Sequence, residues 1–223
     1  MLLPGWCYQC KSLLNQSDQK ARLLICASCL DSLPSFNTEN CIRCGGDHAT
    51  GVCSSDWSKH IIRFDALFYY KAPVRQWVNS FKYSDDQFAG RILRNLLVRW
   101  IKTNPDHLND FDIIIPAPLH PKRFRQRGFN QCEFYLSKIS GHLLKTKVLI
   151  KKTQTKNQVG LSKEERESNL KNAFEVVSEV KDQRILLFDD VCSTGHTLGE
   201  MAKTLKKSGA ASISALTLCR NID

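Results

Sequence analysis

The segment from residue 185 to residue 205 constrains the fold more than any other part of the chain. Its first four residues are apolar, Ile-Leu-Leu-Phe, and two aspartates follow them directly. An apolar run without polar alternation is typical of a strand that is buried on both faces of a parallel sheet. After a short polar loop, apolar residues recur at the spacing of one helix face, at Leu198, Met201, Ala202 and Leu205. The segment therefore predicts a buried strand, a tight loop and a helix.

Strands and helices alternate through the rest of the chain from about residue 61. Apolar runs predict strands over 64–70, 112–116 and 212–218, and helical spacing predicts helices over 74–81, 88–100 and 130–144. Pro105 is expected to stop the second of these helices. The alternation indicates an α/β fold with a parallel sheet flanked by helices. We assign residues 61–223 to this domain and residues 1–60 to a small cysteine-rich, zinc-ribbon-like module, the head.

The head contains seven of the ten cysteines in the chain. Cys7 and Cys10 form one C-x-x-C pair, and Cys26 and Cys29 form another after fifteen intervening residues. A two-residue gap lets a tight turn present both sulfurs to one tetrahedral ion, so this spacing predicts a four-thiolate zinc site. A disulfide framework is disfavoured, because the N-terminus lacks the features of a secretory signal and the cytoplasm is reducing. Zinc would stabilise a module that is too small to bury a large core.

A second zinc site is incomplete in the sequence. Cys41 and Cys44 form a further C-x-x-C pair, but the partner half has Cys53 followed by Asp56 in place of a cysteine. A carboxylate can ligate zinc, so Asp56 is a candidate fourth ligand. Alternative ligands nearby are His48 and His60. The sequence leaves open whether this second site is filled or empty.

The loop after the strand has the chemistry of a sugar-phosphate site. Gly195 allows the backbone to turn tightly, so that successive amide groups can converge on one anion. Neighbouring hydroxyl groups add donors, and the start of the following helix favours negative charge. The two aspartates would repel a phosphate, so we expect them to accept hydrogen bonds from sugar hydroxyls. A phosphate beside a diol predicts a ribose 5-phosphate ligand.

Residues 185–197 resemble the thirteen-residue signature of type I phosphoribosyltransferases, in which an apolar run, an acidic pair and a Thr-Gly loop follow one another. Three other segments resemble the ComF/GntX family of phosphoribosyltransferase-like proteins: residues 115–131 with their Arg-Gly-Phe-Asn-Gln motif, residues 161–174, and the cysteine pairs. The resemblance implies that the acidic pair holds the ribose hydroxyls of phosphoribosyl pyrophosphate and that the loop holds its 5-phosphate. The residues concerned are Asp189, Asp190, Val191, Cys192, Ser193, Thr194, Gly195, His196 and Thr197.

Two basic segments extend the predicted site. The first, which we expect to be a loop, carries four cations in six residues, Lys122, Arg123, Arg125 and Arg127. These side chains could neutralise a pyrophosphate, alone or with Mg²⁺. The second contains Lys163 and Arg166 and is expected to form a lid over the ligand or a groove for polynucleotide phosphates. A formal net charge of +10 also predicts weak, salt-dependent binding to nucleic acid.

Two functions from different classes fit these observations. In the first, which the family resemblance favours, the chain is a competence-associated protein for natural transformation and use of external DNA. It would bind single-stranded DNA and phosphoribosyl pyrophosphate, with proteins of the DNA-import machinery as partners. In the alternative, it is an active phosphoribosyltransferase that acts on an unknown acceptor. We expect a cytoplasmic protein, because no apolar stretch is long enough to span a membrane, and the resemblance adds a peripheral location at the inner membrane.

Overall fold

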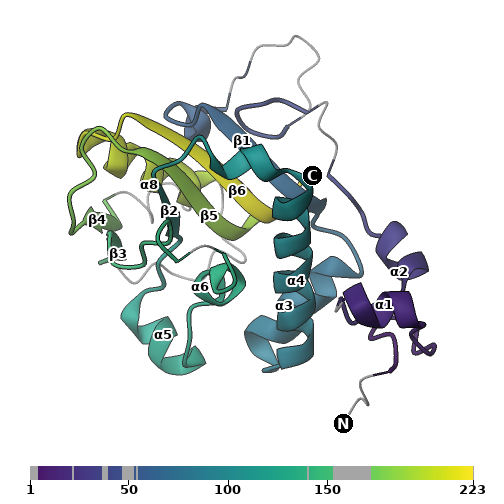
Figure 1. Cartoon of the computed structure of the whole chain (residues 1–223). Coiled ribbons are helices and arrows are strands. Elements are labelled where there is room, and N and C mark those ends of the chain that lie inside the picture. Colours follow the sequence, from purple (N-terminus) through teal and green to yellow (C-terminus); the bar gives the residue numbers. More distant parts are fainter. Residues whose placement is uncertain are drawn as a thin grey trace.

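The computed structural model describes residues 5–21, 23–36, 40–46, 53, 55–139, 141–152 and 172–222. Its centre is a four-stranded parallel sheet in the order β1-β6-β5-β2 (Figure 1). The strands are β1 (Arg63–Tyr69), β2 (Ile113–Pro116), β5 (Arg184–Cys192) and β6 (Ser212–Arg220). This sheet confirms the predicted α/β class with parallel strands.

The strand β5 positions the predicted site. Its four apolar residues, 185–188, are at most 1% exposed, as expected for a strand that is covered on both faces. The strand is longer than the apolar run, because it continues through both aspartates to Cys192. It pairs in parallel with β2 on one side and β6 on the other, and Cys192 lies opposite Arg220 of β6. The carboxyl ends of β5 and β6 therefore lie side by side at the same end of the sheet.

Helices α3 (Val74–Tyr83), α4 (Gln87–Thr103) and α6 (Gln131–Leu136) pack together, whereas α8 (His196–Lys207) packs against β5 and β6 (Figure 1). α3, α4 and α8 bury the apolar faces that their spacing predicted. Asp86 caps the start of α4, because its carboxylate accepts hydrogen bonds from two backbone amides of the first turn. It ends at Thr103, and the short 3-10 helix η2 (Pro105–Leu108) follows, which confirms the predicted stop at Pro105.

The helix predicted over residues 130–144 is much shorter than expected. It starts at the predicted place, with the Asn130 side chain accepting a hydrogen bond from the amide of Cys132, but it ends at Leu136. The chain then returns to the sheet, where the Ile114 amide donates to the Leu143 carbonyl at 2.7 Å and the Lys145 amide donates to the Ile114 carbonyl at 2.9 Å. The outer edge of β2 would otherwise lose these partners, so tertiary pairing overrides helical spacing here.

The basic segment expected to be a loop is instead the helix α5 (Pro121–Arg127). The His120 ring accepts a hydrogen bond from the Lys122 amide at the start of the helix, and Pro121 occupies its first position. Gly128 ends the helix with a φ of 82°. Two short strands that the sequence did not predict, β3 (Leu149–Lys151) and β4 (Phe174–Val176), form an antiparallel ribbon.

The head contains α1 (Gln16–Ala21), α2 (Ala27–Asp31) and the 3-10 helix η1 (Asp56–Ser58). Its backbone covers the outer edge of β1. The Tyr69 amide donates to the Pro34 carbonyl at 2.7 Å, the Phe36 amide donates to the Leu67 carbonyl at 3.0 Å, and the Phe64 amide donates to the carbonyl of residue 42 at 2.6 Å. The apolar core runs from the head into the α/β domain without a break. Among the described helices, none is both long and apolar enough to cross a bilayer.

The close packing of α3 on α4 depends on Gly90. A Cβ atom at this position would lie 2.5 Å from the ring of Phe81, and that ring is held between Phe129 and Phe134 at centroid distances of 4.9 and 4.8 Å. We predict that Gly90→Ala lowers the free energy of unfolding by about 1 kcal/mol, because overpacking outweighs the gain in helix propensity. Urea denaturation measures this difference. Gly141→Ala, where a Cβ meets open space, should have little effect, and a Gly90→Ala protein as stable as wild type would contradict the prediction.

Candidate functional site

The two aspartates at the end of β5 lie in different environments. Asp189 lines a cavity of about 30 Å³ together with the residues that follow it. Asp190 is only 3% exposed, and its carboxylate forms an ion pair with Lys82 at the end of α3. The amide of Asp190 donates a hydrogen bond to the Asp189 carboxylate at 2.9 Å. One acid of the pair therefore faces the cavity, and the other is committed to a buried ion pair.

The carboxyl group of Asp189 titrates near neutral pH. Burial and, after it, the charge of Asp190 raise its pKa to about 7, although the charge of Lys82 opposes this shift. The thiol of Cys132, on α6, lies 3.6 Å from the Asp189 carboxylate, and burial raises the pKa of this thiol well above its usual value. Asp189 is therefore a hydrogen-bond acceptor whose charge changes within the physiological range of pH.

The loop of residues 192–197, which we call the anion loop, joins β5 to α8. Gly195 has a φ of 79° and stands at the start of α8, where no side chain caps the helix. Ser193 is exposed, and Thr194 and Thr197 are partly exposed beside the cavity. Cys192 is buried, and burial raises the pKa of its thiol to about 12, so it is no activated nucleophile. The loop presents backbone and hydroxyl groups around a space large enough for one water molecule or one phosphate oxygen.

Arg220, a buried arginine that the sequence analysis did not identify, fixes the anion loop by hydrogen bonds to its backbone. The guanidinium of Arg220, at the end of β6, donates to the carbonyl of Cys192 at 3.1 Å and also to the carbonyl of Ser193. The arginine is 9% exposed. A cation at the end of a strand was visible in the sequence, but only the register of β6 against β5 brings it to this loop.

The predicted cations of α5 are divided between the site and other surfaces. The charges of Arg123 and Asp189 both act on Lys151 of β3, whose pKa burial lowers to about 8, with Arg123 lowering it and Asp189 raising it. Arg123, Lys151 and Asp189 are therefore electrostatic neighbours. Arg127 instead donates to the Gln131 side chain at 2.5 Å. The remaining α5 cations, Lys122 and Arg125, are exposed, and the predicted lid residues Lys163 and Arg166 lie outside the described residues.

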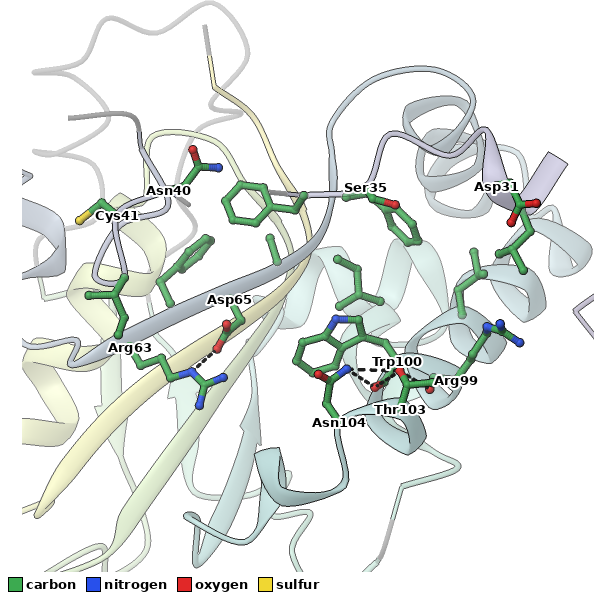
Figure 2. A pocket seen from close by; sticks show the side chains of 18 residues that line it. Asp31, Ser35, Asn40, Cys41, Arg63, Asp65, Arg99, Trp100, Thr103 and Asn104 are labelled. Carbon is green, nitrogen blue, oxygen red and sulfur yellow. Dashed lines mark hydrogen bonds and ion pairs between the residues drawn. The ribbon is translucent and has the colours of Figure 1, made fainter. Parts of the chain in front are cut away.

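A larger cavity of about 780 Å³ lies between the head and the α/β domain (Figure 2). Residues of β1, of the C-terminal half of α4 and of the head line it. Figure 2 shows Asp65, in an ion pair with Arg63 at 2.8 Å, and Trp100 on the α4 side. This cavity is separate from the anion loop, and sequence reasoning did not predict it.

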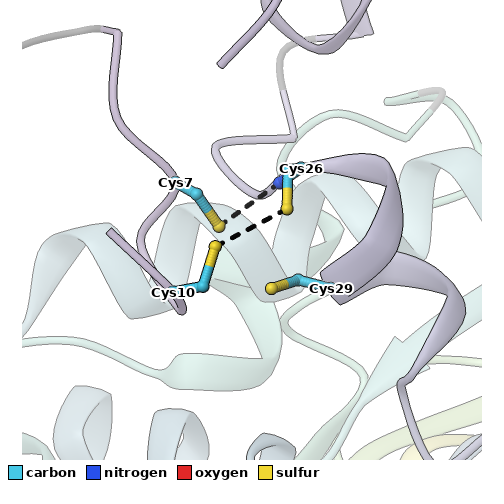
Figure 3. A group of neighbouring side chains, drawn as sticks. All are labelled: Cys7, Cys10, Cys26 and Cys29. Carbon is cyan, nitrogen blue, oxygen red and sulfur yellow. Dashed lines mark hydrogen bonds between the residues drawn. The ribbon is translucent and has the colours of Figure 1, made fainter. Parts of the chain in front are cut away.

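The first cysteine group has the donor set of a zinc site. The sulfurs of Cys7, Cys10, Cys26 and Cys29 lie within 4.8 Å of one another (Figure 3). The sulfurs of Cys10 and Cys26 are 3.7 Å apart, which matches the about 3.8 Å expected for two thiolates on one tetrahedral zinc ion. The Cys26 amide donates to the Cys7 sulfur at 3.3 Å, and all ten cysteines are free of disulfides. The four thiols fit zinc, which would supply a structural crosslink here.

The second cysteine group consists of three thiols among the described residues. The sulfurs of Cys41, Cys44 and Cys53 also lie within 4.8 Å of one another, and the Gly46 amide donates to the Cys44 sulfur at 3.4 Å. These three thiols fit a metal ion in chemistry and spacing.

The structure does not bring Asp56 into the second cysteine group. Its side chain is 85% exposed and forms an ion pair with Lys59 at 2.9 Å. His60 is exposed, and His48 lies outside the described residues. The fourth ligand of the second group therefore stays a prediction.

Comparison with known proteins defines the class of protein. A family model described as "Phosphoribosyl transferase domain" matches residues 133–223, which contain the acid pair and the anion loop. Among solved structures, phosphoribosylpyrophosphate synthetase from Mycobacterium smegmatis aligns with 59% of this chain and 38% of its own, at 19% identity and a TM-score of 0.34. The matched domain and the parallel sheet together define a phosphoribosyltransferase-like α/β protein.

Curated relatives extend the match to nearly the whole chain. Competence protein F of Haemophilus influenzae is 30% identical over 212 residues, covering 88% of this chain and 90% of the relative. The DNA utilization protein YhgH of Escherichia coli K12 is 27% identical over the full length of both chains. Competence protein ComFC of Streptococcus pneumoniae is 24% identical over 88% of this chain and 87% of its own. The chain belongs to the competence protein F, or ComF, family.

The geometry of the first cysteine group predicts that the head depends on metal. Cys26→Ala or a strong chelator should loosen residues 5–21 and 23–36, because four clustered thiols would lose the ion that would crosslink them. Metal analysis should give at least one zinc ion per chain, and a value near two would show that the second group is filled. Limited proteolysis and far-UV circular dichroism measure the loss of structure. An unchanged digestion pattern after the metal has been removed would contradict the zinc assignment.

Proposed function

We propose that this chain is a competence-associated protein that binds phosphoribosyl pyrophosphate and single-stranded DNA and works with proteins that import DNA. The names of the relatives, which refer to competence and DNA utilization, support the biological role. The match to a phosphoribosyltransferase domain supports the ligand. The observation that carries the proposal is the cavity that Asp189 and the anion loop share at the start of α8.

Each part of phosphoribosyl pyrophosphate would have a matching group in this site. The anion loop would hold the 5-phosphate through its amides and the hydroxyls of Ser193, Thr194 and Thr197. Asp189 would accept hydrogen bonds from the ribose hydroxyls, and Asp190 would orient it through the amide that donates to its carboxylate. The pyrophosphate would lie toward Arg123 and Lys151, whose charges already influence each other. Mg²⁺ would neutralise part of the ligand's charge when it binds with the pyrophosphate.

Single-stranded DNA would bind through charge rather than through base recognition. The chain carries a net charge of +10, and Lys122 and Arg125 of α5 are exposed. Lys163 and Arg166, which lie outside the described residues, would add further positive charge. Such a surface attracts the phosphate backbone of any sequence and loses affinity as salt rises.

The second candidate is an active phosphoribosyltransferase, which the match over residues 133–223 favours. Transfer would need no protein nucleophile, since the site would act by holding the ligand and stabilising charge as pyrophosphate leaves. Release of pyrophosphate in the presence of a panel of nucleobases distinguishes this candidate from a pure binding protein. Turnover that Asp189→Asn abolishes while the protein stays folded would establish it.

The pKa of Asp189 makes ligand binding depend on pH. Its ionised fraction falls from about nine-tenths at pH 8 to about one-tenth at pH 6 for a pKa of about 7, so the dissociation constant of phosphoribosyl pyrophosphate should rise about tenfold. Calorimetry with Mg²⁺ present measures this. Asp189→Asn should bind about tenfold more weakly at pH 8 and retain only the pH dependence of the ligand's own phosphates. Equal affinity of Asp189→Asn and wild type at pH 8 would exclude this role.

Two controls separate binding from folding in this experiment. Asp182→Asn, at an exposed position before β5, should bind like wild type. Because the pKa of Asp189 is raised in the folded state, its contribution to stability is present below about pH 4 and is lost as the pH rises through 7. Asp189→Asn should therefore be at least as stable as wild type at pH 8, so weak binding there would not reflect unfolding.

The electrostatic account of DNA binding predicts the effect of α5. Lys122→Gln/Arg125→Gln should reduce the slope of log K against log salt by about 1.4 for single-stranded DNA, because each phosphate contact contributes about 0.7. Fluorescence anisotropy with an oligonucleotide at several salt concentrations measures the slope. Lys102→Gln/Lys181→Gln removes two exposed charges elsewhere and is the matched control. Equal losses in both double variants would show that net charge alone, rather than α5, attracts DNA.

A further inference from the structure

Trp57, in η1 of the head, packs directly against the anion loop and the first turn of α8. A Cβ atom at Gly195 would overlap the indole ring, and a Cβ atom at Gly199 would lie 2.6 Å from the Trp57 carbonyl oxygen. The two glycines are one helical turn apart and face the same neighbour. The indole and its backbone therefore fill the volume that two side chains would otherwise occupy, and any other residue at these positions would push the head away.

Arg220 joins Trp57 to the same loop from another side. Its guanidinium carbon lies 5.8 Å from the centre of the Trp57 ring, within range of a cation–π contact. The same guanidinium donates to the carbonyls of Cys192 and Ser193 in the anion loop. A movement of the indole would therefore disturb both Gly195 and the cation that fixes the loop carbonyls.

The residue after Trp57 is held by both halves of the second cysteine group. Ser58 is fully buried, and its hydroxyl lies 3.3 Å from the Cys53 sulfur. The guanidinium of Arg43, which lies between Cys41 and Cys44 in the sequence, donates to the Ser58 carbonyl at 3.2 Å. The two segments that carry the three thiols therefore hold the backbone next to Trp57 in place through Ser58.

A second route connects the cysteine group to the indole through Phe64 of β1. A Cβ atom at Gly45, directly after Cys44, would lie 2.6 Å from the Phe64 ring. This ring contacts Trp57 edge to face at a centroid distance of 5.8 Å. The turn that carries Cys44 therefore packs on the ring that supports the indole.

We infer that Trp57 is a positioning residue that couples metal binding at the second cysteine group to the shape of the anion loop. This inference rests on the proposed function, in which the loop holds the 5-phosphate. A metal ion on the three thiols would keep Ser58 and Phe64 in place, and Trp57 would then support Gly195 and Arg220. Because coupling between two sites is reciprocal, phosphoribosyl pyrophosphate would also tighten metal binding by the same factor.

Hydrogen exchange of the anion loop tests this coupling without any ligand. Trp57→Ala should accelerate amide exchange in peptides covering residues 192–199 by about tenfold, and Trp57→Phe should restore part of the protection. Trp6→Ala, at a 43% exposed position in the first half of the head, is the matched control and should leave the loop unchanged. Circular dichroism confirms that the variants are folded. Loop exchange equal to wild type in Trp57→Ala would overturn the inference.

A double-mutant cycle shows whether the second cysteine group acts through the indole. Cys53→Ala should also accelerate exchange of the loop, and it should add little in a Trp57→Ala background, because both changes break one chain of contacts. Zinc content should fall in Cys53→Ala and remain at the wild-type value in Trp57→Ala. If Cys53→Ala accelerates exchange equally with and without the indole, Trp57 does not carry the coupling.

Ligand binding supplies the reciprocal measurement. Trp57→Ala should weaken phosphoribosyl pyrophosphate binding about tenfold in calorimetry, and the ligand should tighten zinc binding to wild type, but not to Trp57→Ala, by a similar factor in competition with a chelator. A ligand that tightens zinc binding equally in both proteins would contradict the inference. If wild type does not bind the ligand, the proposed function fails, and the hydrogen-exchange cycle still decides whether Trp57 supports the loop.

Discussion

The buried ion pair between Lys82 and Asp190 is the interaction on which the site depends. Two adjacent carboxylates at the end of a buried strand repel each other and lose solvation. Lys82 brings the compensating charge from the end of α3, so the packing of that helix and the electrostatics of the acid pair are linked. Such a pair adds little net stability, but the loss of one partner is costly. It commits Asp190 to the protein interior and leaves Asp189 to face the cavity.

The head is part of the α/β domain's architecture rather than a module attached by a linker. Its backbone hydrogen bonds cover the outer edge of β1, and its apolar residues join the common core. Tyr8 of the head donates a hydrogen bond to Asp86, the residue that caps α4, and Trp57 packs on the start of α8. The head therefore contacts α4 through Tyr8 and the anion loop through Trp57.

The sequence predicted an element correctly where the residues of that element alone determine its structure. The strand β5, the anion loop and α8 lie where the apolar run, the glycine and the helical spacing predicted them, and the first four cysteines come together as their pairs indicated. It failed where two signals competed. Helical spacing beyond Leu136 lost to pairing with β2, and the basic segment after Pro121 was helical because His120, Pro121 and Gly128 provide start and stop signals that the charge run obscured.

The sequence by itself determined the local chemistry of this protein, namely an acidic pair, a loop of glycine and hydroxyl residues before a helix, and paired cysteines, because each of these depends only on residues a few positions apart. Only the tertiary structure decided which distant groups complete the site. Lys82, Lys151 and Arg220 come from three different elements, and Trp57 comes from the head. Their meeting depends on strand register and helix packing, which long-range burial selects and which no local pattern along the chain encodes.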